Sequence, residues 1–250
     1  MCILFILRNK NNDWPLLIAT NRDEFYDRDF IRPGRHWKNY PYIIAGKDKK
    51  AGGSWLGVNK FGLCVCILNR TSTIAEPSIL KSRGQLVIDA LKFKNAKSAS
   101  GNILKYFEKK FNFFNLFIAD NVNAFWIKYN NFKINLFSIP YGYSIIDNLD
   151  LNDKESIRQF QSKDVFQKAK VPKPEINDFG DWEKMLTLKK EGLDEKNSSI
   201  YVSSKYNKYG TVCSSIIGIP KNRKNKKNIF WLYRKSLQRQ SSFKKLKVFS

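Results

Sequence analysis

The sequence predicts an α+β fold in which the sheets are largely antiparallel. Most apolar runs are short and rich in β-branched or aromatic residues, and the turns between many of them are short enough for hairpins. Helical periodicity is confined to two groups, one central and one later in the chain. With 250 residues, of which 42% are hydrophobic, the chain can close a sizeable core.

Each expected element follows from its local pattern. Strands are expected at 2–8, 15–21, 42–46, 53–59, 62–69, 113–119, 123–129, 132–138, 199–203, 210–219 and 228–233. Helices are expected at 83–95, 98–110, 153–162 and 179–190. Ser82 and Gln85 would form a capping box at the start of the first helix. Asn152 and Glu155 would cap the third helix.

Cys2 is the main candidate for a catalytic residue. Its small side chain favours removal of Met1, which would leave an α-amine of pKa about 7.7–8.0 beside a thiol of pKa about 8.5. Near neutral pH the amine can act as a base and the thiol as a nucleophile. The alternative is that Cys2 is merely part of a hydrophobic first strand.

A polar motif is expected to lie beside Cys2. The second apolar run ends in Asn21-Arg22-Asp23-Glu24, and the turn at 9–13 is rich in Asn and Asp. A hairpin of the first two strands would carry this motif back to the beginning of the first strand.

The motif Asn21-Arg22-Asp23-Glu24 and the opening Met1-Cys2 resemble the hallmarks of the NRDE family, which includes the transport and Golgi organisation proteins. The resemblance is greatest to the bacterial branch and runs from about residue 1 to 233. Further blocks in the family's order are Arg35-His36-Trp37, Ala45-Gly46, Ala51-Gly52-Gly53-Ser54-Trp55-Leu56-Gly57, Leu68-Asn69-Arg70, Ser82-Arg83-Gly84, Phe114-Asn115-Leu116 and Tyr209-Gly210-Thr211-Val212-Cys213-Ser214-Ser215.

The family has been related to N-terminal nucleophile hydrolases, so the resemblance implies a four-layer αββα sandwich. The stretch from Gly57 to Asn69 is similar to a hairpin of choloylglycine hydrolases and penicillin V acylases. In those enzymes the closing Asn helps to form the oxyanion hole, which implies this role for Asn69. An ordinary strand exit is the alternative. Thr20 stands where those hydrolases have an Arg.

The resemblance therefore implies a cysteine amidohydrolase that acts on a small amide. Cys2 would attack the carbonyl, its amine would shuttle the proton, and Asp23 with Asn21 would orient the amine. Arg22 would either bind an anionic group of the substrate or lock the hairpin by ion pairing. Trp55 would either contact the substrate or belong to the core. The competing hypothesis is a non-catalytic carrier or chaperone of a small ligand such as heme or an acyl lipid.

Cysteine usage favours a reducing compartment and no metal site. Cys2, Cys64, Cys66 and Cys213 form neither a disulfide framework nor a zinc pattern, and the chain has a single histidine. We therefore expect no metal and no cofactor. We also expect no membrane-spanning or targeting segment, and a cytoplasmic protein.

The net charge of +23 raises the question of nucleic-acid binding. No acidic residue follows Glu195, yet no nucleic-acid-binding motif accompanies the lysines near the C-terminus. We expect a solvated basic surface and no specific nucleic-acid partner. One domain is expected over 1–250, with a basic tail from about 234, and the sequence does not predict the oligomeric state.

Overall fold

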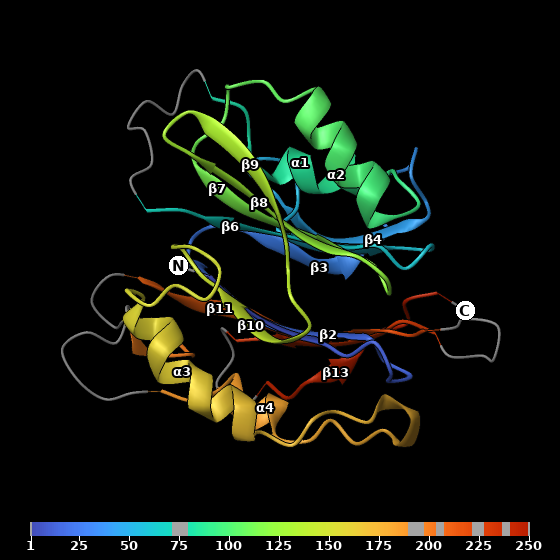
Figure 1. Ribbon diagram of the computed structural model, residues 1–250, viewed down its shortest axis with the longest axis vertical. Coiled ribbons are helices and arrows are strands. Elements are labelled where there is room, and N and C mark those ends of the chain that lie inside the picture. The colour runs from blue at the N-terminus through green and yellow to red at the C-terminus, as the bar shows by residue number, and fades with distance from the viewer. Residues whose placement is uncertain are drawn as a thin grey trace. The chain divides into compact units, whose positions relative to one another are not determined.

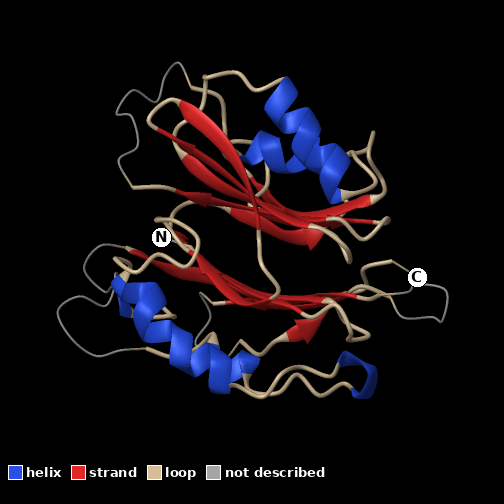
Figure 2. Ribbon diagram, viewed as in Figure 1, coloured by secondary structure: helices blue, strands red, loops and turns tan. Residues whose placement is uncertain are grey.

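The computed structural model describes residues 2–71, 80–189, 198–203, 208–221, 228–236 and 241–249. These residues form two compact units. The first unit comprises Met1–Asp27 and Tyr141–Ser250, and the second unit comprises Arg28–Pro140. Each unit holds one antiparallel sheet with helices against one face of it (Figures 1 and 2).

The sheet of the first unit has six strands in the order β10-β1-β2-β11-β12-β13. Their bounds are β1 Ile3–Arg8, β2 Leu16–Phe25, β10 Gly142–Ile146, β11 Tyr209–Ile219, β12 Phe230–Lys235 and β13 Lys244–Lys245. The central strands β2 and β11 pair along their length, with one register shift between Thr211 and Cys213. The described part of the basic C-terminal segment returns to this sheet, because β13 pairs with β12.

Strands β1 and β2 form the hairpin that the sequence predicts. Ile3 pairs with Asn21, so the polar motif lies at the beginning of β1. Alternate side chains of these strands, among them Phe5 and Ala19, face the helices and are fully buried. Strand β2 runs beyond its expected end at 21 to Phe25, because β11 supplies hydrogen-bonding partners for this extension.

Helices α3 (Ile157–Lys168) and α4 (Trp182–Met185) cover this sheet, with the short 3-10 helix η1 (Pro174–Ile176) between them in sequence (Figure 1). The core between helices and sheet is aromatic. Phe166 of α3 meets Phe5 edge to face with ring centroids 5.0 Å apart, and it meets Trp182 of α4 at 5.4 Å. These contacts fix α3 over β1.

The second unit is a meander of seven strands in the order β3-β4-β5-β6-β7-β8-β9. Their bounds are β3 Phe30–Gly34, β4 Ile43–Asp48, β5 Leu56–Asn59, β6 Cys64–Asn69, β7 Phe114–Ala119, β8 Ala124–Asn130 and β9 Lys133–Ser138. Helices α1 (Gly84–Leu91) and α2 (Ala96–Lys105) pack on one face of this sheet. Every second residue of a strand points to the same face, so buried residues such as Val65 and Ile67 form the apolar face on which α1 and α2 pack.

Glycines in two of the family-like blocks allow close packing in the second unit. A Cβ at Gly46 would lie 2.3 Å from the Trp55 indole. A Cβ at Gly53 would lie 2.5 Å from the main-chain carbon of Gly84, at the start of α1. Only glycine therefore allows the Trp55 indole to pack against residue 46 and the start of α1 to pack against residue 53.

Helices α1, α2 and α4 are shorter than expected, α3 lies later in the chain than the expected 153–162, and two predicted caps are wrong. The Ser82 hydroxyl accepts the N–H of Gly84 at 3.3 Å instead of forming a capping box with Gln85. Helix α3 begins after Ser156, whose hydroxyl accepts the N–H of Gln159 at 3.1 Å. Asn152 instead bonds to β10, where its Oδ1 accepts from the main-chain N–H of Ile145 at 2.8 Å. Among the described residues, α3 is the longest helix with 12 residues, and none has the length and hydropathy to cross a bilayer.

The strand predicted at 199–203 does not form. Its carbonyl groups at 199 and 200 accept hydrogen bonds from side chains, and the segment makes one isolated bridge, between Ser203 and Gly210. Strands β3 and β10 were not predicted from the sequence. Pro33 interrupts the pattern of β3, and turn-forming residues surround the apolar pair that ends β10.

Candidate active site

Cys2 lies immediately before β1 and is half-buried. Its thiol donates to the main-chain oxygen of Asp23 at 3.9 Å, a sulfur contact that joins the start of β1 to β2. Burial raises the pKa of the Cys2 thiol above its ordinary value, and the negative charge of Asp23 raises that pKa further. The thiol is therefore protonated near neutral pH, and its use as a nucleophile requires a base.

Pairing of β2 with β11 brings two of the family-like blocks together. Asp23 lies opposite Thr211, and Arg22 lies opposite Cys213. Directly opposed residues in an antiparallel pair share a face of the sheet. Asp23 and Thr211 therefore lie on one face, and Arg22 and Cys213 lie on the other. Burial is the main reason that the pKa of Cys213 is raised to about 12. The charge of Arg22 lowers this pKa, and that of Cys2 raises it.

Asp23 is the most constrained acidic group near Cys2. Its side chain has no exposed surface, and the Thr211 hydroxyl donates to Oδ1 at 2.7 Å. The Nη2 of Arg158 donates to Oδ2 at 2.8 Å. A buried carboxylate is costly unless it is paired and hydrogen-bonded, and both requirements are met here.

Arg158 is a site residue that the sequence did not reveal. It projects inward from α3, with a side chain that is 2% exposed. Besides Asp23, it donates through Nε to the Ser199 oxygen at 2.8 Å and through Nη2 to the Ile200 oxygen at 3.0 Å. The available signal was the weak apolar pattern of α3, whose core-facing positions include Arg158, Gln159 and Ser162.

Asn21 is fully buried on the face of β2 that meets the helices. Its Nδ2 donates to the Leu186 oxygen at 2.9 Å and to the Ile200 oxygen at 2.8 Å. Its Oδ1 is buried and has no hydrogen-bond partner within the described part of the chain. One acceptor thus remains available beside the N-terminal strand.

Arg22 is almost fully buried, with a side chain that is 6% exposed. Its Nη2 lies 3.5 Å from Oε2 of Glu24, two residues along the same strand. Because both residues lie on β2, this ion pair does not join β2 to β1, and the role of Arg22 stays a prediction.

The other two predicted site residues, Asn69 and Trp55, belong to the second unit. Asn69 is the exposed last residue of β6. The next residue, Arg70, is buried and donates to Oδ1 of Asn115 at 2.8 Å, and the Trp126 indole donates to the same oxygen at 3.0 Å. Trp55 is 9% exposed and meets Phe30 edge to face at 5.5 Å.

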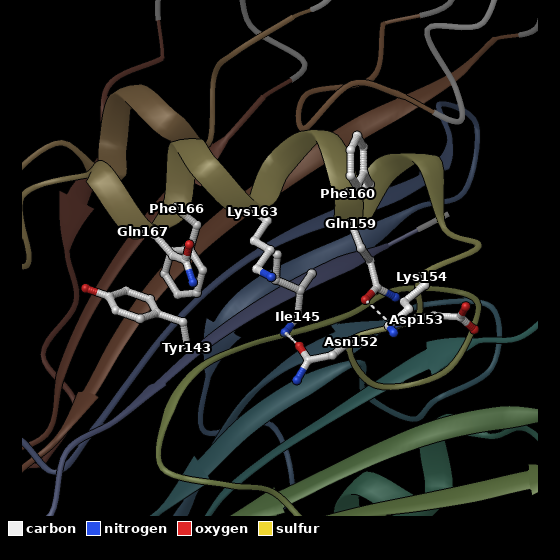
Figure 3. A pocket seen from close by; sticks show the side chains of 10 residues that line it. All are labelled: Tyr143, Ile145, Asn152, Asp153, Lys154, Gln159, Phe160, Lys163, Phe166 and Gln167. Atoms are coloured by element: carbon white, nitrogen blue, oxygen red, sulfur yellow. Dashed lines mark hydrogen bonds between the residues drawn. The ribbon is translucent and has the colours of Figure 1, made fainter.

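A separate cavity of about 550 Å³ lies between α3 and β10 in the first unit (Figure 3). Tyr143, Ile145 and Phe166 provide apolar lining, and Lys163 extends into the cavity from α3. Cys2 does not line it. The cavity is therefore distinct from the surroundings of the thiol.

The remaining cysteines are buried. Burial raises the pKa of the Cys64 thiol far above its ordinary value, so it is a poor nucleophile. Within the described ranges, no group of three or more His, Cys, Asp or Glu side chains is arranged to hold a metal ion.

The sequence profile of the family described as Transport and Golgi organisation 2 matches residues 1–229. The chain belongs to this family. The homologue from Mus musculus is 32% identical over 134 residues, which cover 48% of this chain and 45% of that protein. The homologue from Homo sapiens is 31% identical over 137 residues, with the same coverage. The matched region thus spans about half the length of these family members.

Solved structures of hydrolases share the fold. A mutant conjugated bile acid hydrolase from Clostridium perfringens superposes with a TM-score of 0.53 at 11% identity, covering 97% of this chain and 92% of that one. A Caenorhabditis elegans ortholog of N-acylethanolamine-hydrolyzing acid amidase gives a TM-score of 0.52 at 13% identity, covering 89% and 94%. The likeness confirms the predicted α+β fold of N-terminal nucleophile hydrolase type.

Proposed function

We propose that this family member is a cysteine amidohydrolase whose nucleophile is Cys2. The observation that carries the proposal is the contact between the Cys2 thiol and the main-chain oxygen of Asp23, whose side chain belongs to the buried Asp23–Arg158 pair. The names of the two solved relatives, a conjugated bile acid hydrolase and an acid amidase, support a hydrolytic function on this fold. The proposed substrate class is a small amide.

In the proposed reaction, removal of Met1 frees the α-amine of Cys2. The neutral amine takes the thiol proton as sulfur attacks the amide carbonyl, and Asn69 donates to the developing oxyanion. The C–N bond then breaks, and the ammonium returns the proton to the leaving amine. Water attacks the thioester with the amine again as base, which releases the acid and restores the thiol.

Asn21 and Asp23 would orient the amine in this scheme. The unpartnered Oδ1 of Asn21 supplies an acceptor, and the buried carboxylate of Asp23 supplies negative charge. Arg22 and Trp55 are the proposed substrate-binding residues. Since Arg22 is paired with Glu24, an anionic group on the substrate would have to share or replace that partner.

A blocked N-terminus tests the role of the amine. Insertion of a glutamate between Met1 and Cys2 would prevent exposure of the Cys2 amine while keeping the thiol. We expect turnover of a panel of N-acyl aminocoumarin amides to fall at least about a hundredfold, the usual contribution of a general base. Fluorescence release measures turnover, and iodoacetamide labelling checks that the thiol is still accessible. Undiminished turnover by the extended protein would exclude the amine as base.

The carrier hypothesis has one observation in its favour, the cavity between α3 and β10. This cavity could hold a small apolar ligand without any part played by Cys2, because the thiol does not line it. A carrier would keep its function when Cys2 is replaced, whereas the proposed hydrolase would not.

A further inference from the structure

Asp23 joins the Cys2 thiol to the rest of the first unit. Its main-chain oxygen accepts from the Cys2 thiol and from the Tyr209 hydroxyl, at 3.9 and 3.3 Å. Its buried carboxylate accepts from Arg158 and Thr211. The orientation of this carboxylate is therefore coupled to the main-chain group that contacts the thiol.

Arg158 is itself held in place without help from Asp23. The carbonyl groups of Ser199 and Ile200 accept from its guanidinium, whose planar fork suits several simultaneous contacts. The Ile200 oxygen also accepts from Asn21, which lies two residues before Asp23 on β2. The hydrogen bonds thus close a ring that links α3, the segment 198–203 and β2.

We propose that Arg158 is a positioning residue of the candidate active site, which fixes the Asp23 carboxylate and balances its charge so that Asp23 can hold Cys2 in place. Its catalytic consequence rests on the proposed function. The effect of Arg158 on the Cys2 thiol does not rest on the proposed function, and it can be measured without a substrate. Nothing in the sequence motifs points to Arg158, because it reaches Asp23 across 135 residues.

The electrostatic consequence has a definite sign. The charged groups that act on the thiol are Asp23 and Arg22 on β2 and the N-terminus, while the thiol itself lies close enough to Tyr209 and Cys213 on β11 to raise their pKa values. Among the charged groups Asp23 raises the pKa of the Cys2 thiol most strongly. Removal of Arg158 would take away the positive charge that lies 2.8 Å from the Asp23 carboxylate, so the negative charge of Asp23 would act more strongly on the thiol and the thiol would ionise less readily.

The rate of Cys2 alkylation by iodoacetamide, followed across the range of thiol ionisation, tests the proposal. The extent of labelling is read from the mass of the N-terminal peptide. We expect Arg158→Met to react about tenfold more slowly at neutral pH, which corresponds to a rise of about one unit in the thiol pKa. Lys168→Met is the matched control on the same helix, because the Lys168 side chain is 83% exposed, and it should react like the unmodified protein.

Removing both charges should restore the rate. Arg158→Met combined with Asp23→Asn removes both charges of the buried pair, and Asp23→Asn alone should react faster than the unmodified protein. A residue that merely packs α3 against the sheet would show no such restoration. If Arg158→Met does not fold, Arg158→Lys serves instead, since an ammonium cannot reach Asp23 and both carbonyl groups together, and a smaller decrease is expected.

Unchanged alkylation in folded Arg158→Met or Arg158→Lys would overturn the proposal, as would failure of Asp23→Asn to restore the rate. Circular dichroism establishes which variants are folded. Failure of the hydrolase hypothesis would look different. It would appear as amide turnover that survives loss of the Cys2 thiol, with the alkylation rates still ordered as described.

Discussion

Replacing Cys2 with serine is expected to reduce amide turnover at least about a thousandfold, because a hydroxyl ionises far less readily than a thiol and is a weaker nucleophile. Serine and alanine are small enough to allow removal of Met1, so both variants keep a free amine. Initial rates on the amide panel, measured with equal amounts of folded protein, give the effect.

Substrate binding separates the enzyme from a carrier in the same experiment. Cys2→Ser should still bind the best amide of the panel, since the hydroxyl takes nearly the same space as the thiol. Cys2→Ala should bind it with no turnover. If both variants retain the full cellular function, the carrier hypothesis is correct and the hydrolase hypothesis is wrong.

Replacing Asp23 with alanine is expected to lower the free energy of unfolding by about 3–5 kcal/mol, because Arg158 would remain buried with a charge that has lost its carboxylate. The Thr211 hydroxyl would lose an acceptor as well. Chemical denaturation measures the change. Asp164→Ala removes an exposed carboxylate 3.9 Å from Lys168 on the same helix as Arg158, and should leave the stability unchanged.

The double variant Asp23→Ala with Arg158→Met shows whether the loss comes from the unpaired charge. Its stability should be higher than the sum of the two single losses predicts, since no charge is left buried without a partner. Additive losses would mean that the two side chains contribute independently, and the buried pair would not be the unit that the structure indicates.

The sequence predicts those parts of the fold that depend on local patterns. The β1–β2 hairpin follows from two apolar runs around a polar turn, and it places the motif that contains Asp23 beside Cys2. Strand alternation likewise predicts most strands of both sheets. These features need little information beyond the residues that form them.

The remainder depends on tertiary packing. Arg158 reaches Asp23 because Phe166 anchors α3 over β1, and no local pattern reports such a contact. The segment 199–203 has the composition of a strand, yet its carbonyl groups at 199 and 200 bond to the side chains of Arg158 and Asn21, and only its last two residues bond to β11. Side chains that replace a strand partner in this way cannot be predicted from β propensity.

The intact mass of the native protein tests the central claim most directly, since a free amine on Cys2 is required for the proposed base. We predict that material active on amides has lost Met1 and begins at Cys2. Active material that retains Met1 would contradict the account, because the nitrogen of Cys2 would then be an amide without basicity.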